Sequence, residues 1–132
     1  MSRTVLIVDD ELDMRIFLTT LVKMGGYRAL TAREGGEAVE TARKTPPDLM
    51  ILDIMMPGEG GVRTYRNLRT DPALSDIPVM VLSAVSEKSF QHYLTMLNVR
   101  LDENIPDPDG YVEKPPEPEA VLALIRDILS RH

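Results

Sequence analysis

The sequence contains no cysteine, which excludes a disulfide framework, a thiolate zinc site and a cysteine nucleophile. Long hydrophobic runs are missing as well, because every uncharged apolar stretch is far shorter than the roughly 20 residues of a membrane-spanning helix. The apolar run near the N-terminus ends after four residues at Asp9 and Asp10, unlike that of a secretory signal. These absences favour a cytoplasmic protein that does not associate with a membrane.

Positively charged residues are fewer than negatively charged ones. The chain has 15 Lys and Arg against 21 Asp and Glu, a formal net charge of -6. Nucleic-acid binding through phosphate neutralisation needs clustered Lys and Arg, so we do not expect DNA as a direct partner. The 132 residues, of which 43% are hydrophobic, are enough for one core, and we expect a single domain over residues 1–132.

Apolar residues occur in two alternating kinds of segment. Short runs without polar alternation, such as residues 4–8 and 48–53, are typical of strands that are covered on both faces. Other segments carry apolar residues at helical spacing, such as Phe90, Leu94 and Leu97. The predicted strands are 4–8, 27–32, 48–53, 77–83 and 110–113. The predicted helices are 11–24, 35–44, 60–71, 86–99 and 118–132.

Strict alternation of strands and helices predicts an α/β fold. Right-handed crossovers between successive strands produce a doubly wound parallel sheet with helices on both faces. In such open sheets the ligand site lies outside the carboxyl ends of the strands. One stretch, residues 100–110, has an acidic, linker-like composition, and we expect a loop there.

Acidic residues follow two of the buried strands. Asp9 and Asp10 come after the first strand, and Asp53 ends the third. Carboxylates that meet at one edge raise one another's pKa unless a divalent cation neutralises them. Because only oxygen ligands are nearby in sequence, the pattern predicts Mg²⁺. Asp9 and Asp10 by themselves would be better explained as a helix cap and first-turn acids.

Two further polar residues mark the same predicted edge. Ser83 ends the fourth strand and Lys114 follows the fifth. A lysine ammonium and a serine hydroxyl can both contact phosphoryl oxygens. With that charge balance, the Asp53 carboxylate could attack phosphorus in line. Taken singly, Ser83 would be a turn residue and Lys114 a solvated surface charge, so the hypothesis depends on their combination.

Four motifs together resemble the receiver domain of two-component response regulators across nearly the whole chain. They are VDDE (8–11), ILDIMMPGEGG (51–61), VMVLSA (79–84) and GYVEKP (110–115). The resemblance implies a flavodoxin-like (βα)5 fold with strand order 2-1-3-4-5. It also implies that Asp53 accepts a phosphoryl group from a histidine kinase or a histidine phosphotransfer protein. No output domain is expected in the chain, which would act on a downstream protein through its fourth helix, fifth strand and fifth helix.

The resemblance also assigns the metal ligands. It implies that Mg²⁺ is held by Asp10, by Asp53 and by the backbone carbonyl of Met55. Asp9 would act through water. The expected protein is therefore a phosphoacceptor signalling domain, with at most slow self-dephosphorylation, and not an enzyme.

The same resemblance assigns the switch residues. Lys114 would contact the phosphoryl group, Ser83 would move to hydrogen-bond it, and Tyr111 would swing inward when Ser83 moves. The Lys114–Pro115 peptide bond would be cis. A plainer role for Tyr111 is that of an aromatic residue that only packs on a short edge strand. His92 is expected to face solvent.

The sequence departs from the family pattern mainly in one place. The interval from Ser83 to Lys114 is longer than usual, and the extra residues fall in or after the fourth helix. Three alternative functions differ in what they require of the sequence. A Mg²⁺-dependent phosphohydrolase would need an acid where Met55 stands, and in a flavin-binding module the acids after the first strand would repel phosphate. A scaffold that works without phosphorylation stays open.

Overall fold

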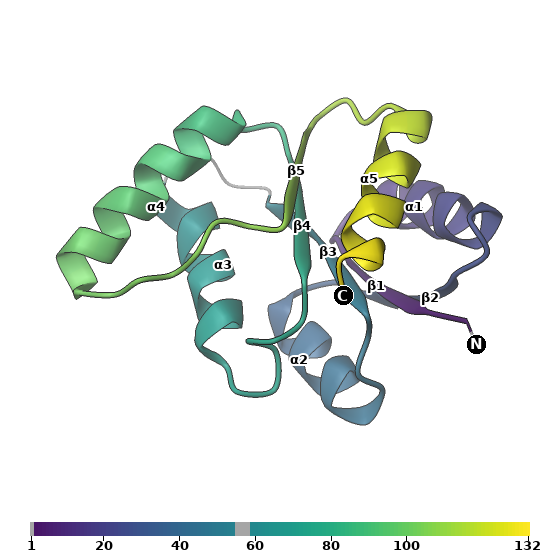
Figure 1. The fold of residues 1–132 in the computed structure, drawn as a ribbon, viewed down its shortest axis with the longest axis horizontal. Helices are drawn as coiled ribbons and strands as arrows, with labels where there is room; N and C mark the ends of the chain where they lie inside the picture. The colour runs from purple at the N-terminus through teal and green to yellow at the C-terminus, as the bar shows by residue number, and fades with distance from the viewer. Residues whose placement is uncertain (1, 55–58) are drawn as a thin grey trace.

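The computed structural model describes residues 2–54 and 59–132. Strands and helices alternate throughout, and each predicted element is present (Figure 1). The strands are β1 (Thr4–Val8), β2 (Arg28–Ala32), β3 (Leu49–Ile54), β4 (Val79–Ser83) and β5 (Gly110–Glu113). The helices are α1 (Leu12–Met24), α2 (Gly35–Lys44), α3 (Glu59–Thr70), α4 (Glu87–Leu101) and α5 (Pro118–Ser130).

All strand pairs are parallel, and the sheet order is β2-β1-β3-β4-β5. Helices α1 and α5 cover one face of the sheet, and α2, α3 and α4 cover the other (Figure 1). The predicted flavodoxin-like (βα)5 architecture is therefore confirmed. None of the helices in the described residues is long and apolar enough to cross a membrane.

The core explains why the strands are continuous apolar runs. In β1, Leu6 and Val8 belong to the core cluster that also contains residues of α2, α3 and α4, whereas Val5 and Ile7 belong to the cluster with residues of α1 and α5. Successive side chains of a strand point to opposite faces, so a sheet with two helical layers needs an apolar residue at every position. Strand β3, at the centre, is buried over its whole length, and this buried strand includes Asp53.

The end of α4 differs from the sequence-based prediction. We expected the helix to stop at Val99, but it continues to Leu101. Asp102 then adopts the left-handed conformation with φ 51°, and the backbone N–H of Glu103 donates to the carbonyl of Asn98 at 2.9 Å. Such a pairing satisfies the last carbonyls of a helix, and Asp tolerates this conformation better than most residues. The linker-like stretch that begins at Arg100 is thus partly helical.

Gly110 allows β5 to approach α5 closely. A Cβ atom there would lie 2.8 Å from Cδ1 of Ile128 and 2.9 Å from Cδ2 of Leu124. We therefore expect Gly110→Ala to lower the free energy of unfolding by about 1–3 kcal/mol through overpacking. The control is Gly35→Ala, because a Cβ at Gly35 would meet nothing within 4 Å. Urea denaturation measures both, and equal effects of the two substitutions would contradict the expectation.

Candidate functional site

The carboxyl ends of four strands bring the predicted polar residues to one edge of the sheet. Asp9 directly follows β1, where its backbone N–H donates to the Ala32 carbonyl at 3.0 Å. Asp53 is the fifth residue of β3, next to the position at which Ile54 pairs with Ser83 of β4. Lys114 directly follows β5, and its backbone N–H donates to the Ser83 carbonyl at 2.8 Å.

The central contact of the site joins Lys114 to Asp53. The Lys114 ammonium nitrogen lies 3.0 Å from Oδ1 and 3.0 Å from Oδ2 of Asp53, and it donates a hydrogen bond to Oδ2. The Asp53 side chain is only 1% exposed and that of Lys114 is 19% exposed. Oδ1 of Asp53 is buried and has no hydrogen-bond donor among the described residues. Apart from the ion pair with Lys114, Oδ1 therefore has no partner of this kind among the described residues, so it could also bind a further cation or attack an electrophile.

Four acidic residues form a cluster around this contact, which we call the acidic cluster. Oxygen atoms of Asp9, Asp10, Glu11 and Asp53 all lie within 4.8 Å of one another. Asp9 and Asp53 are buried, whereas Asp10 and Glu11 are exposed. Oδ2 of Asp9 is a second buried oxygen without a hydrogen-bond donor within residues 2–54 and 59–132. Such a set of hard oxygen atoms fits a small divalent cation.

The electrostatics of the acidic cluster show an excess of negative charge. The pKa of Asp9 is raised to about 6, mainly by burial and also by the neighbouring Asp53, while the Glu11 N–H and Lys114 oppose the rise. Burial lowers the pKa of the Lys114 ammonium, but Asp53, Asp9 and Glu11 outweigh it and raise that pKa overall. The single ammonium group does not compensate all of the carboxylates, so a divalent cation would relieve the repulsion.

The Ser83 and Tyr111 hydroxyl groups lie on one hydrogen-bonded path. Ser83 is fully buried, and its Oγ donates to the Ile54 carbonyl at 2.9 Å and accepts from the Val85 N–H at 3.0 Å. The Tyr111 hydroxyl donates to the Val85 carbonyl at 2.6 Å. Val85 therefore connects the residue beside the site to the aromatic residue on the edge strand.

Five other features bear on the sequence-based predictions. The Lys114–Pro115 peptide bond is cis, and His92 is exposed, both as predicted. Met55, the predicted carbonyl ligand, lies outside the described residues. Sequence reasoning did not find the 3.7 Å ion pair between Glu11 and Lys114. It also missed the Arg15 guanidinium, which donates to the Asp9 carbonyl at 2.9 Å, because only folding brings these groups together.

Comparison with known proteins identifies the family. The family model of the response regulator receiver domain matches residues 5–126. The chain belongs to this family. Receiver domains are signalling domains rather than conventional enzymes; they pair with histidine kinases and generally bind Mg²⁺ at an acidic pocket.

Individual relatives agree with this assignment. The receiver domain is 32% identical, over 98% of its length, to the phosphate regulon transcriptional regulatory protein PhoB of Pseudomonas aeruginosa, of which it covers 53%. It is 29% identical to protein Rrf1 of Nitratidesulfovibrio vulgaris, covering 100% of this chain and 86% of Rrf1. The solved signal receiver domain of a signal transduction histidine kinase from Syntrophus aciditrophicus is 28% identical, with a TM-score of 0.76 over 98% of this chain and 92% of that one. The chain spans about half the length of most curated relatives that it matches.

The raised pKa of Asp9 predicts a pH-dependent stability without metal. Native Asp9 holds its proton up to about pH 6, whereas the unfolded residue loses it near pH 3.9. Stability should therefore fall as the pH rises from about 4 to about 6, by on the order of 2 kcal/mol, and stay low above that range.

Urea unfolding in EDTA, compared between wild type and Asp9→Asn, measures this effect. We expect the variant to lack this fall, because it carries no carboxyl proton at position 9. A difference in unfolding free energy between the two proteins that is the same at every pH would contradict the assignment of the raised pKa to Asp9.

Proposed function

We propose that this receiver domain accepts a phosphoryl group on Asp53 from a histidine kinase or a histidine phosphotransfer protein, with Mg²⁺ as its cofactor. The observation that carries the proposal is the buried Asp53 carboxylate, whose two oxygens both lie 3.0 Å from the Lys114 ammonium and whose Oδ1 has no other hydrogen-bond donor among the described residues. A carboxylate nucleophile with a cation already beside it suits in-line attack on phosphorus.

The acidic cluster supplies the groups that would hold the metal. Asp9, Asp10 and Asp53 are the proposed ligands, with Asp9 acting through water, and the Met55 carbonyl is proposed from the family resemblance alone. When bound, Mg²⁺ would neutralise these carboxylates and offset the charge on the phosphoryl oxygens. Oδ2 of Asp9 and Oδ1 of Asp53 support this assignment, because both are buried and accept no hydrogen bond from the part of the chain that the structure describes.

Phosphoryl transfer follows from the residues that surround Asp53. A carboxylate oxygen of Asp53 forms the new bond to phosphorus, while the bond between phosphorus and the donor histidine nitrogen breaks and the electron pair stays on the imidazole. The Lys114 ammonium, already beside the nucleophile, then pairs with a phosphoryl oxygen. Release of phosphate is slow and sets the duration of the signal, so no metabolite is turned over.

The Ser83 hydroxyl is the proposed sensor of the new group. Phosphorylation adds a charge of about -1.5 to -2 and three acceptor oxygens. The Ser83 hydroxyl would leave the Ile54 carbonyl and donate to the phosphoryl group, which favours a different arrangement of the β4–α4 loop. Because Tyr111 donates to the Val85 carbonyl, a movement of this loop would change the position of Tyr111.

The proposed output surface comprises α4, β5 and α5, which lie next to the switch residues. β5 is at the edge of the sheet, and Met96 and Val99 of α4 are exposed. The acidic net charge of -6 supports a protein rather than a nucleic acid as the direct partner of these residues. A cytoplasmic location, where histidine kinases present their phosphohistidine, completes the proposal.

Phosphorylation can be tested with acetyl phosphate and Mg²⁺. Intact-mass measurement should show one adduct of about 80 Da on the wild type, the mass of a phosphoryl group, and none on Asp53→Asn. The matched control is Asp48→Asn, which makes the same chemical change just before β3 at its opposite end, and it should retain the adduct. A wild-type chain that stays unmodified would instead favour a scaffold that works without phosphorylation.

Metal binding can be tested separately by thermal unfolding. Millimolar MgCl₂ should raise the melting temperature of the wild type in proportion to the logarithm of its concentration once the site is saturated. Asp10→Asn should lose at least half of that increase, because it removes a charge from the acidic cluster. Asp13→Asn, an exposed acid in the first turn of α1, should keep it. An equal increase with KCl at matched ionic strength would contradict a specific site.

A further inference from the structure

The segment between α4 and β5, residues 102–109, is irregular but firmly held; we call it the α4–β5 segment. The Asn98 side chain donates to the Ile105 carbonyl at 3.0 Å and accepts from the Ile105 N–H at 3.0 Å. Arg66 of α3 binds both carboxylate oxygens of Glu103, at 2.8 Å and 3.1 Å. Two parallel hydrogen bonds between the same pair of residues fix the orientation of the two groups as well as the distance between them. The α4–β5 segment therefore has a defined conformation.

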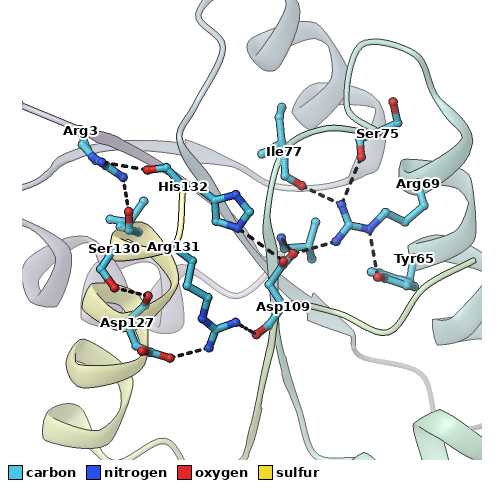
Figure 2. A network of polar contacts seen from close by, with 12 residues as sticks. Arg3, Tyr65, Arg69, Ser75, Ile77, Asp109, Asp127, Ser130, Arg131 and His132 are labelled. Carbon is cyan, nitrogen blue, oxygen red and sulfur yellow. Dashed lines mark hydrogen bonds and ion pairs between the residues drawn. The ribbon is translucent and has the colours of Figure 1, made fainter.

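Tyr65 of α3 anchors the same segment from inside the core. Tyr65 is fully buried, and its hydroxyl donates to the Pro106 carbonyl at 2.8 Å. The Arg69 guanidinium donates to the Tyr65 hydroxyl at 2.9 Å and to Oδ2 of Asp109 at 2.8 Å (Figure 2). Asp109 in turn accepts the Val79 N–H at 2.8 Å at the start of β4. The position of Tyr65 and that of the α4–β5 segment therefore depend on each other.

Phe90 connects Tyr65 to the switch residue Tyr111. The Phe90 ring centroid lies 5.5 Å from that of Tyr65, with 72° between the planes, and 5.5 Å from that of Tyr111, with 56° between the planes. Phe90 is buried, and its backbone N–H bonds to the Ser86 carbonyl at the start of α4. Tilted and edge-to-face pairs at this spacing are attractive, and close-packed rings cannot move independently.

We propose that Tyr111, Phe90 and Tyr65 form an aromatic relay that couples the Ser83 hydroxyl at the phosphoryl site to the α4–β5 segment. The two sites lie at opposite ends of β4, because Ser83 ends that strand and the Asp109 N–H pairs with the Val79 carbonyl at its beginning. The signal that the relay would transmit rests on the proposed phosphorylation of Asp53. The packing of the three rings, which couples their positions, is present without phosphate. Phosphorylation of Asp53 would then change a second surface, which is formed by the α4–β5 segment and is separate from β5 and α5. By linkage, a partner bound to the α4–β5 segment would change the state of the switch.

The mechanical coupling can be tested on the unphosphorylated protein by NMR-detected amide exchange. The reporters are the hydrogen-bonded amides of Glu103, Ile105 and Asp109. Tyr111→Phe keeps the ring but removes its bond to Val85, and should raise their exchange rates about three-fold or more, the scale of one aromatic contact. In a Phe90→Leu background the same change should have no further effect. Amides of β2, away from the relay, should keep their rates, which separates coupling from general destabilisation.

Two further variants make the exchange experiment decisive. Tyr93→Phe is the matched control, because Tyr93 is half-buried on α4 against the same core but lies outside the relay; it should leave the reporters unchanged. If Phe90→Leu does not fold, Tyr65→Phe takes its place, since it keeps the ring and removes only the hydroxyl with its bonds to Pro106 and Arg69. Reporter rates that are unchanged in Tyr111→Phe, or changed equally in Tyr93→Phe, would overturn the relay.

The second part of the experiment uses the phosphorylated protein. Intact mass and reporter exchange are measured on one sample treated with acetyl phosphate and Mg²⁺. We expect the wild type to gain the adduct and its reporters to change about three-fold or more, whereas Tyr65→Phe gains the adduct but loses at least half of that change. An adduct without any change at the reporters would overturn the relay. The absence of an adduct contradicts the phosphoacceptor function instead, and the unphosphorylated arm then decides the relay alone.

Discussion

The contact between the Lys114 ammonium and the Asp53 carboxylate is the interaction on which the site depends. It joins residues 61 positions apart in the chain, so it exists only when β3, β4 and β5 are aligned. Burying a carboxylate without a partner costs several kcal/mol, and a lysine at hydrogen-bond distance offsets much of that cost. The acidic cluster still keeps more negative charge than Lys114 neutralises, and this excess makes a divalent cation chemically reasonable, because without one the carboxylates would repel an anionic phosphoryl group.

In the rest of the fold, the residues that stabilise the core differ from those that form the proposed signalling site. Apolar residues on both faces of the sheet supply the core, and they leave the carboxyl edge to polar groups that contribute little to packing. Ser83 lies where these two regions meet, since it is buried yet forms hydrogen bonds with loop atoms. Through Val85 and Tyr111 the edge is connected to α4, and through Phe90 and Tyr65 it is connected to the opposite end of the molecule.

Sequence patterns predicted most of this arrangement for a simple reason. Parallel strands place their carboxyl ends at one edge, so the positions of Asp9, Asp53, Ser83 and Lys114 at strand ends already implied that they would meet. The end of α4 was predicted wrongly, because the left-handed Asp102 and the bond from Glu103 to Asn98 leave no periodic signal. The stretch after Val99 is rich in acids and prolines. That composition predicts a loop, although the helix continues for about another half-turn.

The sequence by itself determined the element order, the two-faced sheet and the set of polar residues at its carboxyl edge, since these follow from local periodicity and from the geometry of parallel strands. Only the tertiary structure decided which of those groups touch. Three contacts depend on side-chain directions and on distances between separate elements: the pairing of Glu11 with Lys114, the bond from Arg15 to the Asp9 carbonyl, and the packing of Phe90 between two tyrosines. Spacing along a chain does not encode those directions, because packing selects them after the backbone is in place.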